Sequence, residues 1–310
     1  MKTELKRIVR RVSIAFGALL FAFVAATGEE AASPLAETLP QSVYSDSDRQ
    51  GSVTRIEYPS RDYAGDGSEL TKHAIIYLPY GYGEDPDARY DLIVLCHGIG
   101  GTESEWGFDK LSCVAKKSLD QLIAGGAVRP VIVVCPNGRS TADCYNTSFT
   151  NAASFYFFGQ ELRNDLLPYI DENYLTYGSD APGDLAASRD HRAMAGLSMG
   201  GMQTINIGLC ECLDLFSAYG AFSAAPTSYS RSEIAAKLNA FPDYDIRLFY
   251  SVCGKQDGIA YASSSLAAKG LDEKTDKLDA ATNFYYQEVN GGHDFNVWNL
   301  GFYNFLRLLG

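Results

Sequence analysis

Residues 192–208 read Arg-Ala-Met-Ala-Gly-Leu-Ser-Met-Gly-Gly-Met-Gln-Thr-Ile-Asn-Ile-Gly, and this stretch decides how the rest of the chain is interpreted. A short apolar run leads into Gly196-Leu-Ser-Met-Gly200, and a helix is expected to follow directly. This is the pattern of a nucleophile elbow, a strand-turn-helix that raises one serine, here Ser198, above the carboxyl edge of a sheet. Glycines suit a turn so tight that side chains would collide with backbone. A glycine-rich turn that merely contains a serine would look the same, so the rest of the chain must supply a histidine, an acid and an oxyanion hole.

The composition favours a folded domain with a large core. The chain has 310 residues, of which 46% are hydrophobic, so disorder is not expected. Its formal charge is −12, and we expect no nucleic-acid partner because nucleic-acid binding needs a basic surface. The 20 tyrosines and 16 phenylalanines suit either a core or a surface that stacks on sugar or phenolic rings.

The first 26 residues have the pattern of a secretory signal peptide. Five basic residues precede the almost continuously apolar run Val12–Ala26, and small residues at its end offer a cleavage site. Because the run is short for a membrane span, we expect cleavage rather than an uncleaved anchor, with no stable membrane association afterwards. The mature protein would be secreted out of the cell or into a periplasm. Residues 27–50 are polar and contain prolines, which predicts a flexible linker before a single domain at 51–310.

The seven cysteines do not form a recognisable metal site. Their number is odd, so at least one thiol stays free or pairs outside the chain. Cys210-Glu-Cys212 lacks the spacing of a zinc site, and the chain has only four histidines, so we expect no structural metal. A disulfide that involves Cys113 or Cys144 is compatible with the sequence but cannot be assigned from it.

Strands and helices alternate along residues 51–310. The expected strands are 53–58, 73–80, 92–96, 130–135, 193–195, 216–222, 246–252 and 283–289. The expected helices are 111–123, 154–174, the segment after Ser198, 232–238 and 297–309. This alternation predicts an α/β fold with a mostly parallel central sheet and helices on both faces. The loops that carry the motifs follow the carboxyl ends of strands, where open α/β sheets place their sites.

The general base can be sought by elimination among the four histidines. His73 lies in an early strand with no glycine turn, and His191 precedes the elbow strand at the edge away from Ser198. His97 opens a glycine-rich loop on the correct edge. His293 follows a strand and two glycines late in the chain, where the Ser…Asp…His order of α/β-hydrolases requires the base. We therefore predict that His293 is the base.

The acid should follow a strand between Ser198 and His293. Asp257 does so, because it lies in the turn Gly254-Lys-Gln-Asp-Gly258 after the strand at 246–252. Its role would be to hold the imidazole in the right tautomer and to stabilise the imidazolium that forms when the serine proton moves. An Asp-Gly turn without a catalytic role is the alternative.

An oxyanion hole needs two backbone N–H groups aimed at the developing negative charge. One would come from Met199, the residue after the nucleophile, and the other from the loop His97-Gly-Ile-Gly-Gly101. Ile99 is the preferred donor in this loop, and Gly98 is the alternative. A phosphate-cradling loop is disfavoured, because the Lys-Ser/Thr of a P-loop and the third spaced glycine of a dinucleotide fingerprint are both missing.

Three separated motifs together resemble a known family. They are His97-Gly-Ile-Gly-Gly101, Gly196-Leu-Ser-Met-Gly-Gly201 and Gly291-Gly-His-Asp-Phe-Asn-Val-Trp298. In this order they look like the feruloyl and acetylxylan esterases of carbohydrate esterase family one, which are similar to esterase D. The likeness runs from about residue 53 to the end. It implies the α/β-hydrolase fold, with Ser198 as nucleophile, Asp257 as acid and His293 as base, and with no metal or cofactor. The family acid often follows Gly-Thr-Asn/Glu, whereas this chain has Gly254-Lys-Gln.

The resemblance implies a secreted serine carboxylesterase that works through an acyl-enzyme. The implied substrate is an esterified plant polysaccharide or oligosaccharide, and the implied product is ferulic or another hydroxycinnamic acid released from arabinoxylan. Trp106, Phe295 and Trp298 would flank an aromatic acyl group, or would pack as core or rim. We expect the protein to act as a monomer. The alternatives are an acetylxylan esterase, a related acyltransferase and, more remotely, a non-catalytic exported carbohydrate-binding protein on a retained fold.

Overall fold

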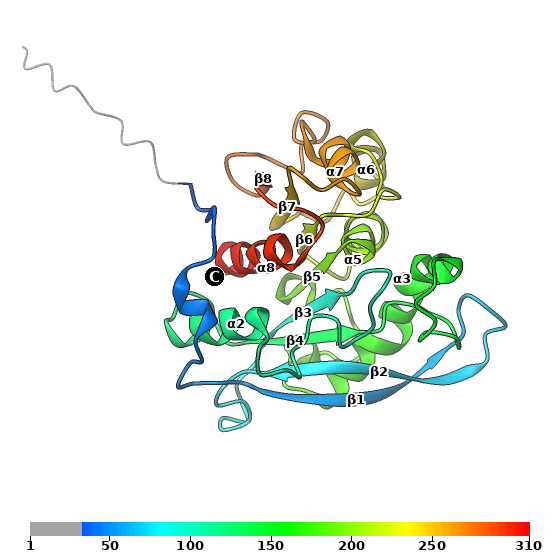
Figure 1. Ribbon diagram of the computed structural model, residues 1–310. Helices are drawn as coiled ribbons and strands as arrows, with labels where there is room; N and C mark the ends of the chain where they lie inside the picture. Colours follow the sequence, from blue (N-terminus) through cyan, green and yellow to red (C-terminus); the bar gives the residue numbers. More distant parts are fainter. Residues whose placement is uncertain (1–32) are drawn as a thin grey trace, which may run out of the picture. The chain divides into compact units, whose positions relative to one another are not determined.

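The computed structural model describes residues 33–310, so the predicted signal peptide lies outside the described residues. Residues 34–310 form one compact unit around an eight-stranded sheet of order β1-β2-β4-β3-β5-β6-β7-β8 (Figure 1). The strands are β1 (Ser52–Arg61), β2 (Glu69–Leu78), β3 (Asp91–Cys96), β4 (Val131–Pro136), β5 (Arg192–Leu197), β6 (Ala218–Phe222), β7 (Leu248–Gly254) and β8 (Phe284–Val289).

Helices connect most of these strands. The α-helices are α2 (Val114–Ala124), α3 (Phe158–Glu161), α4 (Leu167–Asn173), α5 (Met199–Gln203), α6 (Arg231–Leu238), α7 (Tyr261–Ala268) and α8 (Phe295–Leu309). The short 3-10 and π segments are η1 (Gln41–Tyr44), η2 (Phe149–Phe157), η3 (Leu162–Leu166), η4 (Tyr177–Asp180), η5 (Arg189–His191) and η6 (Thr204–Leu209). Helix α7 has no counterpart among the helices expected from the sequence, because its Ser- and Ala-rich segment shows no clear apolar period.

The sheet is mostly parallel, as the alternation of strands and helices predicts. Strands β3 to β8 pair in parallel, while β1 and β2 form an antiparallel hairpin whose second strand pairs antiparallel with β4. The carboxyl ends of β3, β5, β7 and β8 therefore meet at one edge, so the loops that follow them lie close together. This confirms the predicted α/β fold class.

Both faces of the sheet are covered by helices, which explains why the central strands are continuously apolar. In β3, Leu92, Val94 and Cys96 pack into one core cluster, and Ile93 and Leu95 pack into the other. The second cluster includes side chains of α2 and α8, and the first includes side chains of η3, α4, η6, α6 and α7. Figure 1 shows α2 and α8 together on one side of the sheet.

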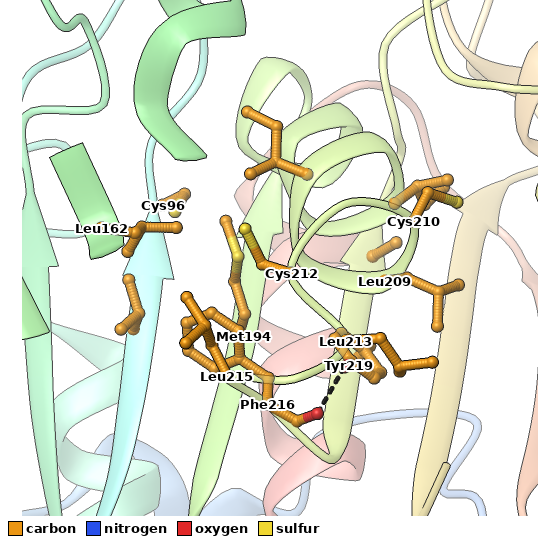
Figure 2. Packing of buried hydrophobic residues seen from close by; sticks show 14 of the residues in the cluster. Cys96, Leu162, Met194, Leu209, Cys210, Cys212, Leu213, Leu215, Phe216 and Tyr219 are labelled. Carbon is orange, nitrogen blue, oxygen red and sulfur yellow. Dashed lines mark hydrogen bonds between the residues drawn. The ribbon is translucent and has the colours of Figure 1, made fainter. Parts of the chain in front are cut away.

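The elbow strand β5 is anchored by a dense apolar cluster on one of these faces. Figure 2 shows Met194 of β5 among the side chains that follow η6, with Leu213 and Phe216 nearby. These three residues are fully buried. Tyr219 is also fully buried, and its hydroxyl donates to the carbonyl of Phe216 at 2.6 Å, so its one polar atom is satisfied. This packing gives the strand before Ser198 a rigid support.

The structure differs from one expectation of the sequence analysis and settles one point that the sequence left open. Residues 34–50 are not a solvated linker: Asn304 of α8 exchanges two hydrogen bonds with the backbone of Ala36, and Val43 of η1 is 1% exposed. The polar composition of residues 34–50 does not indicate this packing, because backbone groups of the segment make most of its polar contacts. All seven cysteines lie within residues 33–310, and in this part of the chain each is buried and free, so no disulfide involves Cys113 or Cys144.

No helix within residues 33–310 is both long enough and apolar enough to cross a membrane.

Candidate active site

Ser198 lies at a strained turn between β5 and α5. Its backbone has φ 52° and ψ −113°, a conformation that costs a non-glycine residue about 1–3 kcal/mol. The surroundings hold it there: its N–H donates to the carbonyl of Phe222 at 2.9 Å, and its carbonyl accepts the N–H groups of Met202 and Ala225. The turn leaves no room for side chains, since a Cβ on Gly200 would lie 2.5 Å from the carbonyl oxygen of Cys96.

Ser198, His293 and Asp257 form one hydrogen-bonded relay. The Nε2 atom of His293 lies 3.0 Å from Ser198 Oγ, and its Nδ1 atom lies 2.8 Å from Asp257 Oδ2. A carboxylate can only accept, so Nδ1 carries the proton and the Nε2 lone pair faces the serine hydroxyl. The serine proton can therefore pass to His293. The structure thus brings together the three residues that the sequence selects from the ends of three separate strands.

Asp257 is kept ionised although it is only 2% exposed. Its Oδ1 atom accepts the backbone N–H groups of Ile259 and Ala260 at 3.0 and 2.8 Å, so both oxygens have partners. Burial by itself would raise the pKa of this carboxyl. The backbone hydrogen bond from Ala260 and the hydrogen bond and charge of His293 outweigh that effect, and the pKa of Asp257 lies below its ordinary value.

The loop after β3 presents fewer free amides than its sequence offers. The N–H of Gly98 donates to Glu105 Oε2 at 2.6 Å, so the alternative oxyanion donor, Gly98, is already engaged. In the described chain, residues 33–310, the N–H groups of Ile99 and Met199 have no hydrogen-bond acceptor. Both residues line the same pocket as Ser198. These two amides are therefore available for an oxyanion, whereas the amide of Gly98, the alternative donor, is already engaged.

His97 supports this loop as a neutral side chain. Its Nδ1 atom lies 2.6 Å from the carbonyl oxygen of Gly98, and its Nε2 atom accepts the N–H of Gly138 at 3.0 Å. These partners require the proton on Nδ1. Burial lowers the pKa of His97 to about 3, so the ring stays uncharged. His97 thus joins the loop after β3 to the loop after β4 and does not act as a base.

A pocket of about 380 Å³ opens beside Ser198 and has a mostly apolar lining. Its lining residues are Gly98, Ile99, Gly100, Glu105, Phe149, Ala152, Tyr156, Leu197, Ser198, Met199, Ala225, Pro226, Thr227, Ile259, His293 and Trp298. Phe149, Tyr156 and Ile259 are 79%, 43% and 60% exposed, so large apolar side chains face solvent at its rim. Exposed apolar groups that gather around a cavity are typical of a binding site.

The three aromatic residues expected to bind substrate have different positions. Trp298 lines the pocket and meets the His293 ring edge-on at 5.1 Å between centroids. Phe295 packs against Trp298 and Trp106 and is not part of the lining. Trp106 is 3% exposed, and its indole N–H donates to the carbonyl of Cys96, so it belongs to the core. The expectation that Trp106 and Phe295 flank a bound group is therefore not met, because proximity in sequence to a motif does not decide which way a ring points.

Other lining residues gave no signal in the sequence. Phe149 begins η2 in a stretch that reads as a polar loop, and Tyr156 lies in the same segment. Ile259 follows the Asp257 turn, and Pro226 follows β6. Apart from Pro226, which lies in the stretch Ser223-Ala-Ala-Pro226 of the family resemblance, none of them belongs to a motif, so only the assembly of three separate segments reveals them.

The sequence of this chain matches the Esterase family over residues 69–309. It is 31% identical over 243 residues to endo-1,4-beta-xylanase Y of Acetivibrio thermocellus, covering 76% of this chain and 20% of that protein. It is 36% identical over 232 residues to the endo-1,4-beta-xylanase/feruloyl esterase of Xylanibacter ruminicola, covering 73% of this chain and 27% of that protein. This chain thus spans between a fifth and about a quarter of the length of these relatives.

The fold is also that of a solved relative. The CE1 ferulic acid esterase of the anaerobic fungus Anaeromyces mucronatus superposes with a TM-score of 0.69 at 21% identity, covering 88% of this chain and 96% of that one. The likeness confirms the α/β-hydrolase fold. The family match confirms the resemblance to an esterase family that the three sequence motifs indicate.

Proposed function

The chain belongs to the Esterase family and is a serine ester hydrolase, and on that premise we propose that it releases ferulic acid or a related hydroxycinnamic acid from feruloylated arabinoxylan. The name of one relative, an endo-1,4-beta-xylanase/feruloyl esterase, supports this choice. The single observation that carries it is the apolar pocket of about 380 Å³ beside Ser198.

The size and lining of this pocket favour an aromatic acyl group over acetyl. Burial of apolar surface contributes about 25 cal/mol per Å². An aromatic side chain buries about 150–250 Å², and an aromatic acyl group is of similar size. An acetyl group would leave most of the cavity empty. Phe149, Tyr156 and Trp298 offer ring faces and edges to a phenolic ring. Glu105 is the one acidic residue in the pocket lining.

Acylation would follow from the relay. His293 Nε2 takes the proton of Ser198 Oγ as the oxygen attacks the ester carbonyl, and the carbonyl oxygen becomes an oxyanion held by the amides of Met199 and Ile99. Asp257 stabilises the resulting imidazolium. The carbon–oxygen bond to the sugar then breaks, and His293 returns the proton to the departing sugar oxygen.

Deacylation would use the same groups in the same order. A water gives its proton to His293 Nε2 and attacks the acyl carbon, and a second tetrahedral oxyanion forms in the same amide site. Its collapse breaks the bond to Ser198 Oγ, which recovers the proton from His293, and the free acid leaves. Besides the ester and this water, each step uses side chains and backbone amides of this chain.

We also propose that the enzyme acts outside the cytoplasm. The basic and apolar pattern of residues 1–26 supports export, and a cell-wall polysaccharide cannot enter the cell. Mass spectrometry of the protein recovered from the culture medium or the periplasm would locate its amino terminus. A protein retained in the cytoplasm with residues 1–26 intact would contradict export.

The function is tested by ester release from feruloylated and acetylated arabinoxylan side by side, with Ser198→Ala as the inactive control. We expect release of ferulic acid by the wild type and none by the variant. Release of acetate alone would replace the proposal with an acetylxylan esterase. No release from either ester, together with no labelling of Ser198 by a fluorophosphonate, would identify a non-catalytic binding protein.

A further inference from the structure

Arg139 lies behind the loop that carries the free Ile99 amide. It follows β4, it is 0% exposed, and its guanidinium donates from Nη1 to the carbonyl of Gly101 at 2.7 Å and from Nη2 to the carbonyl of Ile99. Charged donors bind carbonyl oxygens more strongly than neutral ones, and a planar guanidinium can hold two acceptors in a fixed geometry. The loop after β3 is therefore held from a neighbouring loop.

These contacts fix both peptide planes that flank Ile99. The peptide before it contains the Gly98 carbonyl, which lies 2.6 Å from His97 Nδ1 and accepts the Gly101 N–H. The peptide after it contains the Ile99 carbonyl, which Arg139 holds. In a trans peptide the N–H points opposite to the C=O. A carbonyl held toward His97 therefore directs the Ile99 N–H the other way. Because Arg139 holds the following peptide plane, rotation about both backbone bonds of Ile99 is restricted.

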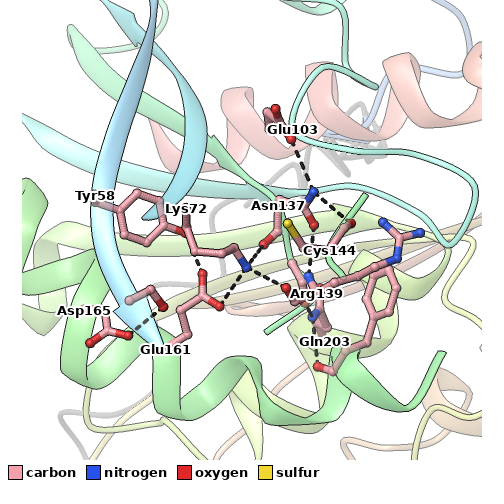
Figure 3. Close-up of polar contacts among 12 residues, drawn as sticks. Tyr58, Lys72, Glu103, Asn137, Arg139, Cys144, Glu161, Asp165 and Gln203 are labelled. Carbon is pink, nitrogen blue, oxygen red and sulfur yellow. Dashed lines mark hydrogen bonds and ion pairs between the residues drawn. The ribbon is translucent and has the colours of Figure 1, made fainter. Parts of the chain in front are cut away.

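The backbone of Arg139 is itself held by buried polar groups, which Figure 3 shows. Lys72 of β2, which is fully buried, donates from Nζ to the carbonyls of Arg139 and Asn137 at 2.5 and 3.0 Å and to Glu161 Oε2 at 3.0 Å. The Arg139 guanidinium also stacks over the Phe155 ring, 4.8 Å from its centroid. The backbone of Arg139 is therefore anchored, and the Phe155 ring covers one face of its guanidinium.

The elbow helix contacts the same loop. Gln203 of α5 donates from Nε2 to the carbonyl of Gly138 at 2.8 Å and to that of Phe155 at 2.9 Å. Helix α5 begins with Met199. The Met199 amide and the Ile99 amide therefore both belong to segments that contact the same buried residues, 137–139. Two donors that come from different loops can thus keep a constant separation.

We infer that Arg139 is a positioning residue for ester hydrolysis, which keeps the Ile99 amide aimed at the oxyanion without touching substrate. The inference rests on the oxyanion assignment in the proposed function but not on the identity of the acyl group. Because the amide acts on charge that develops in the transition state, loss of Arg139 lowers kcat and leaves KM nearly unchanged.

The test compares Arg139→Met and Arg139→Lys with the wild type on 4-nitrophenyl acetate, a small ester that any serine esterase of this kind hydrolyses. Loss of one well-placed oxyanion donor costs about 10²–10³-fold in kcat, and a misaimed donor costs less. We expect Arg139→Met to lower kcat about 10–100-fold with KM within about threefold. Arg139→Lys should recover part of the loss, because an ammonium can still reach one carbonyl.

A second readout isolates the oxyanion. An aryl trifluoromethyl ketone forms a tetrahedral adduct with the serine, whose oxyanion occupies the same amide site. Its inhibition constant should rise in Arg139→Met by the factor by which kcat falls, as expected for a transition-state mimic. If Arg139 had a purely structural role, Arg139→Met would lower the melting temperature and leave the ratio of the ketone inhibition constant to kcat unchanged.

The matched control is Arg189, a second buried arginine. It donates to the carbonyls of Leu213, Phe216 and Asp245 and stacks on Tyr244, but it precedes β5, at the edge of the sheet opposite Ser198. Arg189→Met should lose comparable stability and keep the wild-type kcat.

The outcomes are distinct. The inference would be overturned if Arg139→Met folds and its kcat and ketone affinity lie within twofold of those of Arg189→Met. It would also be overturned if Arg139→Met changes KM alone. If Arg139→Met does not fold, Arg139→Lys carries the same comparison. An enzyme that cleaves 4-nitrophenyl acetate but releases no ferulic acid would overturn the proposed acyl specificity and leave this comparison intact.

Discussion

The carboxylate of Glu105 accepts the backbone N–H of Gly98 at 2.6 Å, at the wall of the pocket that holds Ser198. This contact uses up one amide of the glycine-rich loop and leaves the next one, Ile99, free. It also places a negative charge near the position where an oxyanion would form. Burial raises the pKa of Glu105, although the Gly98 hydrogen bond and the charges of Arg139 and His293 oppose that rise.

Glu105→Gln should therefore stabilise the protein at neutral pH. The amide oxygen of glutamine can still accept the Gly98 N–H, while the cost of burying a charge disappears. A carboxyl whose folded pKa lies above its unfolded value destabilises the fold increasingly as pH rises between the two values. In urea unfolding, the free energy of unfolding of Glu105→Gln should exceed that of the wild type at pH 7. This difference should vanish below about pH 4, near the ordinary carboxyl pKa. An advantage that grows on acidification would contradict this account. As a comparison, Glu105→Leu, which leaves the Gly98 N–H unpaired, should cost about 1–3 kcal/mol.

Substitutions of Ser198 should separate catalysis from backbone strain. Both Ser198→Ala and Ser198→Gly should abolish ester hydrolysis, because removal of a triad nucleophile costs about 10⁶ in kcat. Ser198→Gly should be the more stable of the two by about 1 kcal/mol, because glycine tolerates the φ of 52° that alanine does not. Thermal unfolding of the two inactive variants measures this difference. Equal stabilities would mean that the turn is not strained.

Asp257→Asn should lower kcat by about 10⁴ without preventing folding, because the amide favours the wrong imidazole tautomer. The hydrogen bonds from Ala260 and His293 keep the pKa of Asp257 low, so its ionised form contributes stability above the ordinary carboxyl pKa of about 3.9. That contribution is lost as pH falls through the lower folded pKa. The stability difference between wild type and Asp257→Asn should be constant from pH 5 to 7 and shrink below about pH 4. A difference that persists in acid would place the stabilising interaction elsewhere.

The exposed aromatic residues at the pocket rim should set acyl specificity. Phe149→Ala and Tyr156→Ala should each raise KM for methyl ferulate about tenfold, because a lost aromatic contact is worth about 0.5–1.5 kcal/mol beyond its buried area. KM for 4-nitrophenyl acetate should change little. Tyr80, which is 55% exposed and does not line the pocket, is the control residue: Tyr80→Ala should leave both constants unchanged. Equal rises in KM for the two esters would show that Phe149 and Tyr156 do not contact the aromatic acyl group.

The buried pair of Lys72 and Glu161 should be sensitive to removal of one partner. Both side chains are fully buried, and Glu161 also accepts the hydroxyl of Tyr58 at 2.5 Å. Glu161→Gln leaves the Lys72 ammonium buried without a counter-charge and should cost about 3–5 kcal/mol in urea unfolding. The double variant Lys72→Met/Glu161→Leu should lose less than the sum of the single variants. Additive losses would show that the two charges do not stabilise one another.

Local sequence determined most of the elements and the residues of the candidate site. Continuous apolar runs mark β3 and β4 because both faces of these strands are covered. Glycines are required around Ser198 because a Cβ on Gly196 or Gly200 would lie 2.5 Å from a neighbouring backbone atom. Chain order alone singles out Asp257 and His293, because the fold sets the order in which strands present their loops. The first two features depend on residues adjacent in the chain, and the third depends on the order of the motifs along it.

Only the tertiary structure decided which of these groups are free to act. Glu105 engages Gly98 and leaves the amide of Ile99 free, and Trp106 is buried in the core with its indole N–H bonded to the Cys96 carbonyl, so its ring does not line the pocket. Residues 34–50 read as a linker, yet their backbone docks on α8. The physical reason is common to all three. A hydrogen bond or a ring contact between distant elements leaves no periodic trace in either segment, so the availability of an amide, a ring or a backbone carbonyl is settled only when the segments meet.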